Sequence, residues 1–390
     1  MRKWITAAGL VAAMMLGSPS ARAEQQGVTD NEILLGSIQA LSGPVASWGV
    51  PIANGLRMAV DDINSEGGIH GRKLRIIVED DQYDPRKTLQ AADKLIKHDK
   101  IFAFLCNLGT PQNLALVKVV ERTGVPLIFP QTADPKAWTP VSKLRFGFLF
   151  PNPEQGVIIT RYLLDTKKYT KLGVIYQDDE LGKSYLSGIE QELEKRGVEL
   201  AASASIKRNE IDASSQVMKL KAAGVDAIIQ ASVIPVAVAV LKERAKLNWD
   251  VDVVITSSGY ATSVVSLAGA AAEGAYAMGQ VPVPYPDLSP ELADWNKRYQ
   301  ERFGEPADLG ALFGYQTTLL IKQGLEKAGK DLTVDSLAAG LEQIKDYTDF
   351  FGTVPYSLSK DDHLAAHGVF LFQVKNGRWV KASDYIPLGQ

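Results

Sequence analysis

Short apolar runs alternate with longer segments of helical period along most of this 390-residue sequence, and this alternation restricts the fold more than any other feature. Runs this apolar are typical of strands buried on both faces, which occurs where helices cover a parallel sheet from both sides. The runs with the length of strands are EILLGSIQ (32–39), KLRIIVED (73–80), IFAFLC (101–106), PLIFP (126–130), KLGVIYQ (171–177), DAIIQAS (226–232) and DVVITSS (252–258). The pattern predicts an α/β protein with parallel sheets.

Three proline-rich breaks divide this pattern and predict two compact lobes. They are PQTADPKAWTP with RFGFLFPNPEQG (130–156), VPVPYPDLSP (281–290) and FGTVPYSLSKDD (351–362). Breaks without long disordered linkers suit crossings of the chain between lobes. We expect an N-terminal lobe from 24–150 plus 282–355, and a C-terminal lobe from 151–281 plus 356–390. Asn376-Gly377 predicts a terminal hairpin.

Residues 1–23 have the anatomy of a secretory signal peptide. Arg2 and Lys3 form a basic start, the run 5–16 is apolar but too short to span a membrane, and Ala21-Arg22-Ala23 is an A-x-A cleavage pattern. We expect export to the periplasm with cleavage, and a retained anchor is the alternative. No later stretch approaches 18 consecutive apolar residues, so we expect a mature protein that is not membrane-embedded.

Charge and cysteine content narrow the choice of partners. Loss of three basic residues with the leader takes the formal charge from −3 to −6, which argues against nucleic acid or anionic membrane as the main partner. Cys106 is the single cysteine, so an internal disulfide is impossible, and its apolar run predicts an inert core thiol. We expect a monomer.

No catalytic, metal or nucleotide motif stands out. The Gly-Lys-Ser of LGKS (181–184) lacks the first glycine of a phosphate loop, and the first strand has no GxGxxG after it. His363 and His367 in HLAAH have the spacing of a helical metal pair, but a solvated loop is the favoured interpretation. We found no nucleophile elbow. The sequence predicts a protein that is not an enzyme and holds no metal or cofactor.

The residues after each predicted strand suggest a binding cleft. In an open parallel sheet, ligands bind outside the carboxyl ends of the strands, where helix N-termini offer N–H donors to an anion. Small, hydroxylated, amide and aromatic residues occupy these ends: 42–48, 107–110, 131–134, 177–179, 231–233 and 257–260. Trp48 and Tyr260 offer flat apolar surface. The pattern predicts a cleft for a small anionic or polar organic molecule, and ordinary capping residues are the alternative.

Several of these segments also resemble one family. LSGPVASWG (41–49), AVDDINSEGGIHGRKLRIIVEDDQYDP (59–85), FLCNLGTPQNLA (104–115), GVPLIFPQTADP (124–135) and AAAEGAY (270–276) resemble the branched-chain-amino-acid-type solute-binding proteins of ABC importers. The resemblance covers nearly all of the mature chain. It implies a type I periplasmic binding fold, in which two Rossmann-like lobes joined by three crossovers close on a ligand, with the importer's permease subunits as partners.

The resemblance also implies site residues. Trp48 would pack beside the ligand, loops after two first-lobe strands would hold its carboxylate, and second-lobe contacts would fall near Leu181, Ser232 and Ser257. Together with the strand ends, the candidate ligand-binding residues are Ser42, Trp48, Asn107, Gly109, Thr110, Gln131, Thr132, Ala133, Leu181, Ser232, Ser257 and Tyr260.

Two departures from the family pattern bear on the ligand. Counting back from the shared AEG at 272–274, the acidic residue that pairs with a ligand ammonium is replaced by Ser257, and Tyr83 stands where a disulfide partner of Cys106 would be. A buried ammonium needs a charged partner. The NLGTPQN variant resembles binders of aromatic acids. We therefore expect a small organic acid without an α-ammonium, such as an aromatic carboxylate. The alternatives are an amino-acid binding protein, a ligand-sensing module of the same fold, and a secreted enzyme.

Overall fold

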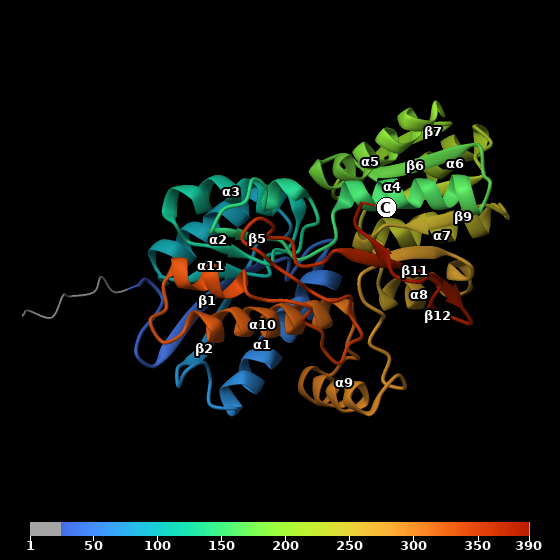
Figure 1. Ribbon diagram of the computed structural model, residues 1–390. Helices are drawn as coiled ribbons and strands as arrows, with labels where there is room; N and C mark the ends of the chain where they lie inside the picture. Colours follow the sequence, from blue (N-terminus) through green and yellow to red (C-terminus); the bar gives the residue numbers. More distant parts are fainter. Residues whose placement is uncertain (1–24, 390) are drawn as a thin grey trace, which may run out of the picture.

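The computed structural model describes residues 25–389, so the expected signal peptide lies outside the described residues. Two sheets, each flanked by helices, form two lobes of one molecule (Figure 1). The first sheet has the order β2-β1-β3-β4-β5, and all its strands are parallel. Its strands are β1 (Glu32–Gln39), β2 (Lys73–Asp80), β3 (Ala103–Leu105), β4 (Leu127–Ile128) and β5 (Arg145–Phe146).

The second sheet has the order β12-β11-β10-β9-β8-β6-β7, with β13 paired to β11. Strands β6 to β10 are parallel, while β11 runs antiparallel to β10 and forms the predicted terminal hairpin with β12. The strands are β6 (Leu172–Gln177), β7 (Ala202–Ile206), β8 (Ala227–Ala231), β9 (Asp252–Ile255), β10 (Tyr276–Gly279), β11 (Gly368–Lys375), β12 (Arg378–Lys381) and β13 (Ile386–Pro387). The predicted α/β class with parallel sheets is confirmed.

Helices cover both faces of each sheet. In the first lobe, α2 (Pro85–Lys97) and α3 (Thr110–Thr123) cover one face, and α1 (Ala46–Ser65) and α10 (Leu309–Ala328) cover the other. Helices α9 (Pro290–Phe303) and α11 (Val334–Leu341) complete this lobe. The second lobe contains α4 (Asn152–Arg161) packed on α5 (Glu180–Arg196), and α6 (Ser214–Ala222) followed by α7 (Ile234–Lys246) and α8 (Thr262–Ala268).

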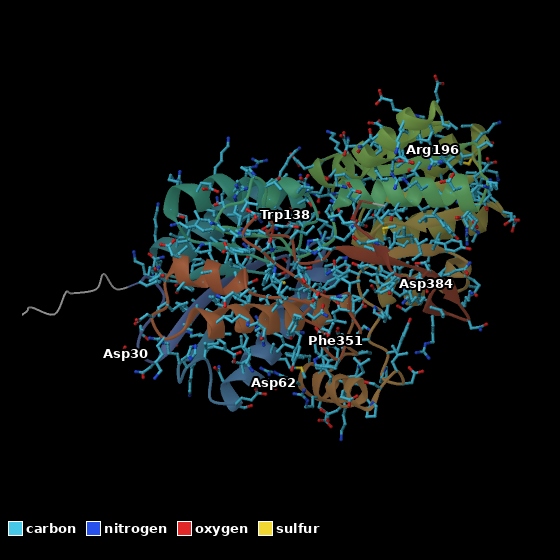
Figure 2. All side chains as sticks on the ribbon, in the orientation of Figure 1. Asp30, Asp62, Trp138, Arg196, Phe351 and Asp384 are labelled. Atoms are coloured by element: carbon cyan, nitrogen blue, oxygen red, sulfur yellow. The ribbon has the colours of Figure 1, made fainter. Side chains whose placement is uncertain are left out.

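Glycines allow α1 and α10 to pack with their backbones in contact. A Cβ atom on Gly55 would lie 2.0 Å from the carbonyl oxygen of Ala311, and one on Gly314 would lie 2.2 Å from that of Ile52. Asp62 of α1, labelled in Figure 2, fixes the same helix to its neighbours. Its carboxylate accepts hydrogen bonds from Arg298 Nη1 at 2.9 and 3.0 Å and from the Tyr315 hydroxyl at 2.6 Å. The α1–α10 pair therefore positions the loop that leads into α1.

Gln280 follows β10 and contacts two segments that are distant from it in the sequence, at Phe150 and at residues 354–356. Its Oε1 accepts from the backbone N–H of Phe150 at 3.0 Å, and its Nε2 donates to the Tyr356 hydroxyl at 3.0 Å. Its backbone oxygen accepts from Val354 N at 3.1 Å. Gln280 therefore joins the segments near residues 150, 280 and 354–356, and we propose this junction as the hinge region.

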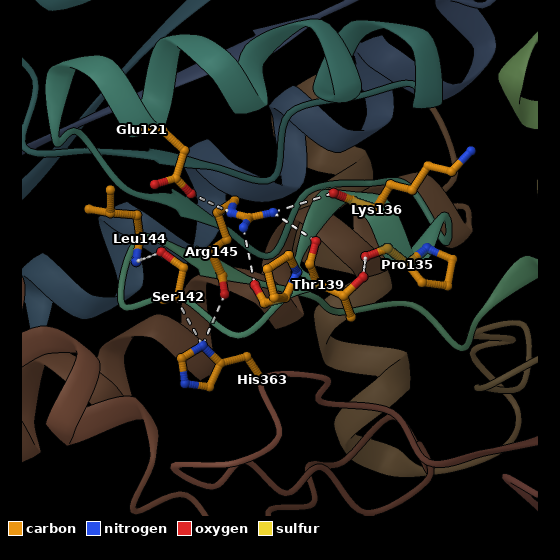
Figure 3. Close-up of polar contacts among 9 residues, drawn as sticks. Glu121, Pro135, Lys136, Thr139, Ser142, Leu144, Arg145 and His363 are labelled. Atoms are coloured by element: carbon orange, nitrogen blue, oxygen red, sulfur yellow. Dashed lines mark hydrogen bonds and ion pairs between the residues drawn. The ribbon is translucent and has the colours of Figure 1, made fainter.

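The segment before β11 is attached to the first lobe by the cluster in Figure 3. The buried Arg145 side chain donates to the Glu121 carboxylate at 2.7 Å and to the carbonyl oxygens of Lys136, Thr139 and Pro140 at 3.1–3.4 Å. His363 stacks on Phe146 with ring centroids 3.9 Å apart, and its Nδ1 donates to the carbonyl oxygens of Ser142 and Arg145 at 3.1 Å. We therefore propose a third crossover near residue 367, later than the expected lobe boundary at 356.

Candidate ligand-binding site

A cavity lies between the two sheets, at the carboxyl ends of their parallel strands. About 70 Å³ of the cavity is accessible to the centre of a water molecule. Its wall is mostly apolar, with a few hydroxyl and amide groups, which is the usual composition of a small-molecule site. First-lobe loops, second-lobe loops and the crossovers each contribute to it. The expected placement of a cleft at the strand ends therefore matches the position of this cavity.

The first-lobe wall is a polar cradle at the start of α3. Strand β3 ends at Leu105, Gly109 takes the left-handed φ of 102°, and α3 begins at Thr110, so the chain turns sharply beneath the cavity. The hydroxyl groups of Thr110 and Thr132 lie 2.8 Å apart and both residues are buried. Free N–H groups of a helix N-terminus next to two hydroxyl groups form a favourable environment for a carboxylate. Gly109, Thr110, Gln131, Thr132 and Ala133 all line the cavity.

Trp48 covers the cavity from the first turn of α1. Its indole is only 7% exposed and stacks on Phe313 of α10, with centroids 6.0 Å apart and planes within 10°. Its Nε1 donates to the backbone oxygen of Ser258 in the second lobe at 3.1 Å. Trp48 thus forms part of the wall and also bridges the two lobes.

The second-lobe wall comes from the ends of β6, β8 and β9. Leu181 is in the first turn of α5, where Asp179 caps the helix by accepting from Leu181 N at 3.0 Å. The Ser257 hydroxyl lies 3.1 Å from the Tyr185 hydroxyl. Tyr260 stacks on Phe372 with centroids 4.7 Å apart, so its ring is held in the core and forms a fixed part of the wall. Leu181, Ser257 and Tyr260 all line the cavity.

Three candidate residues lie outside the cavity wall, each for a definite reason. Ser42 is exposed and donates its hydroxyl to the Asp80 carboxylate at 2.6 Å. Asn107 is buried, and its Oδ1 accepts from Ile38 N at 2.9 Å, so it joins β1 to the end of β3. Ser232 is buried beneath the second-lobe wall, with its backbone oxygen accepting from the Ser258 hydroxyl at 3.1 Å. These three side chains bond to neighbouring groups of the protein, and their direct contact with a ligand stays a prediction.

The sequence did not point to several wall residues. Phe313 and Tyr185 lie within helices, and Gln280 and Phe150 lie on crossovers. The other wall residues not predicted are Tyr83, Leu149, Asn152, Gln155, Gly279 and Val369, whereas Val45, Leu108, Val233 and Ser258 lie in the predicted strand-end segments without being named as candidates. The proline-rich breaks signal the crossovers, but no pattern indicates which of their side chains turn inward.

The wall carries no formal charge. Among the described residues that line the cavity there is no Asp, Glu, Lys, Arg or His. Burial raises the pKa of Tyr83 and of Tyr185 above the usual phenol value, so both phenols stay neutral at pH 7. Gln155 Oε1 accepts from Ser257 N at 3.1 Å, which leaves an amide and not a carboxylate beside the position of the expected acidic residue. An ammonium in this cavity would lack an anionic partner.

The structure also shows the surroundings of the residues considered for thiol and metal chemistry, Cys106, His363 and His367. Cys106 is buried, and burial raises its pKa to about 12, which agrees with an inert core thiol. His367 Nε2 lies 2.8 Å from Asp362 Oδ2, whereas His363 Nδ1 contacts backbone carbonyl oxygens and its Nε2 lies 3.3 Å from Glu342 Oε1, so the two histidines have different partners. The interpretation of HLAAH as a solvated loop is wrong for His363, which is buried. Between residues 25 and 389 the acidic, histidine and cysteine side chains form no cluster of three suited to a metal. None of the helices in that range has the length and apolarity needed to cross a membrane.

Comparison with known proteins identifies one family. Residues 32–378 match the model of the family described as periplasmic binding protein. The chain is 23% identical, over 90% of its length and 92% of the other protein, to Leu/Ile/Val-binding protein homolog 1 of Brucella suis.

Solved structures with the same fold differ in what their names say they bind. A fatty acid ABC transporter substrate-binding protein from Thermomonospora curvata has a TM-score of 0.83 at 22% identity, covering 94% of this chain and 95% of that one. A branched-chain amino acid ABC transporter protein from Thermus thermophilus with bound valine has a TM-score of 0.82 at 17% identity, covering 92% and 97%. At these identities the structural likeness establishes the fold alone.

Proposed function

The chain belongs to the periplasmic binding protein family, and on that premise we propose that it is an extracytoplasmic solute-binding receptor of an ABC importer. The cavity between two lobes joined by three crossovers supports a receptor that closes on a solute and delivers it to permease subunits. We propose that the receptor acts as a monomer in the periplasm after cleavage of residues 1–23. A wall without a charged acid or base supports binding without catalysis.

Two classes of solute have separate support. The names of the relatives favour a branched-chain or similar amino acid, and they support this class better than an acid that lacks an amine. The cavity favours the second class, a small carboxylate without an α-ammonium. The single observation that carries this second proposal is the absence of any acidic side chain among the described residues of the wall. Leaving an ammonium buried without a charged partner costs several kcal/mol, on the order of 3 or more.

The two classes share a carboxylate, and we propose the same position for it. The hydroxyl groups of Thr110 and Thr132 and the N-terminus of α3 would hold the carboxylate. Trp48, Leu181 and Tyr260 would surround the apolar part of the solute, whether an aliphatic chain or an aromatic ring. From the geometry we favour the acid without an ammonium. An aromatic carboxylate is one member of that class.

A thermal-shift screen tests this proposal. The solutes are leucine, valine, 4-methylpentanoate, 3-methylbutanoate, benzoate and cinnamate, so that each amino acid is paired with its analogue lacking the amine. Because a ligand that binds only the native state raises the melting temperature, we expect the amine-free acids to give the larger shifts. A shift with the amino acids alone would support the amino-acid class. No shift with any carboxylate would contradict the proposed position of the anion.

A further inference from the structure

One carboxylate joins the lobes outside the ligand cavity. Asp308 precedes α10 in the first lobe, and α8 belongs to the second lobe (Figure 1). Asp308 Oδ1 accepts from Thr262 N at 3.0 Å, across the lobes, and from Leu309 N of its own helix at 2.7 Å. Asp308 Oδ2 accepts from Ser263 N in a longer contact of 3.4 Å. Asp308 therefore binds the first turns of helices in both lobes.

Helix α8 has no capping side chain of its own. Its N-cap residue is Ala261, which cannot accept a hydrogen bond from the first-turn N–H groups. A helix start leaves such groups without intrahelical partners, and a side-chain oxygen normally satisfies one or two of them. The first lobe supplies this oxygen to the second, and its negative charge lies at the positive end of the helix dipole.

We propose that Asp308 is a latch that stabilises the closed arrangement of the lobes and thereby sets the affinity for the solute. The latch proposal rests on the proposed function in one respect, namely that the two lobes open and close around a solute. Asp308 does not line the ligand cavity, so it acts as a positioning residue. When the lobes separate, Leu309 N keeps its partner but Thr262 N and Ser263 N lose theirs. The inter-lobe bonds therefore favour the closed state alone.

The latch predicts a specific loss of affinity. A ligand that binds the closed state has an apparent affinity reduced by the fraction of protein able to close. Loss of a helix cap shifts an equilibrium by roughly tenfold or somewhat less. Removing the latch should therefore weaken binding by about tenfold, although no atom of the ligand is touched.

Two variants remove the latch from opposite sides. Asp308→Ala removes the acceptor. Thr262→Pro removes one donor without changing charge, and proline is well tolerated at the first position of a helix. Ala261 has the extended φ of −157° and ψ of 157° that a following proline requires. The matched control is Thr333→Ala, which removes the cap of α11 within the first lobe alone.

The test measures binding of 4-methylpentanoate and of leucine by calorimetry, the radius of gyration of the ligand-free protein by small-angle X-ray scattering, and thermal unfolding. We expect both latch variants to bind about tenfold more weakly and to have a larger radius of gyration. We expect the double variant to differ little from either single one, and Thr333→Ala to lose stability without losing affinity. Wild-type affinity and scattering in both latch variants would overturn the proposal. If neither probe binds the wild-type protein, the proposed solute class fails. The latch is then tested by scattering without ligand, and an unchanged radius of gyration in Asp308→Ala would refute it.

Discussion

Asp349 makes the stability of this protein depend on pH in the direction opposite to that caused by most carboxylates. Its side chain lies near the hinge, where it accepts from Gln316 Nε2 at 2.8 Å and from Phe351 N at 3.0 Å. Burial opposes ionisation more than these bonds favour it, and the pKa of Asp349 rises from 3.8 to about 6. Through Gln316 and Tyr356 the same hydrogen-bonded chain reaches Gln280 at the cavity wall.

The raised pKa fixes the sign and size of the effect. Between pH 4 and pH 6 the native state holds a proton that the unfolded chain has released, so stability from this group falls as pH rises through that window. A shift of about two pKa units corresponds to about 3 kcal/mol at pH 7, as an upper value. Asp349→Asn removes the titration while keeping an oxygen that can accept from Phe351 N.

Urea unfolding at pH values from 4 to 7.5 measures this effect as a difference between proteins. We subtract the free energy of unfolding of the wild type from that of Asp349→Asn. This difference should increase by up to about 3 kcal/mol from pH 4 to pH 7. Asp361→Asn, which removes one negative charge from an exposed position, is the control for net charge. A difference that stays constant across the range would refute the reasoning, because it would mean that Asp349 titrates alike in both states.

Two further substitutions test the wall and the packing that positions it. Trp48→Ala should weaken solute binding by roughly 1–3 kcal/mol, because the indole forms part of the wall and bonds to Ser258 across the lobes; unchanged affinity in calorimetry would give Trp48 a structural role only. Gly55→Ala should lower the free energy of unfolding by about 2 kcal/mol or more, because the new Cβ would lie 2.0 Å from the Ala311 carbonyl oxygen; an unchanged urea midpoint would show that α1 and α10 can separate at little cost.

The fold was largely predictable because most strands are continuous apolar runs. β1 and β2 have the bounds that the sequence indicates, and Asp84 caps α2 as its position before Pro85 suggests. β7 was missed because its sequence ASASI is small and half polar at a sheet edge, and β5 because it has two residues between proline-rich loops. Short edge strands depend on their neighbours for stability more than on their own sequence.

The candidate site was predictable where it follows strand ends. Thr110 and Thr132 are far apart in sequence, yet the parallel β3 and β4 bring their hydroxyl groups within 2.8 Å. Asn107 and Ser232 also follow strands, but their side chains turn beneath the loops, and residue type alone does not reveal that direction. Phe313 enters from α10, and only the packing of α10 on α1 brings it to Trp48.

The most direct test of the proposed solute class is calorimetric titration of the wild-type protein with leucine and with 4-methylpentanoate. The two solutes have the same side chain and carboxylate and differ only in the α-ammonium. Because the described wall offers no acidic side chain, we predict that 4-methylpentanoate binds at least tenfold more tightly than leucine. Tight binding of leucine with little or none of 4-methylpentanoate would contradict our account of the cavity and establish the amino-acid class.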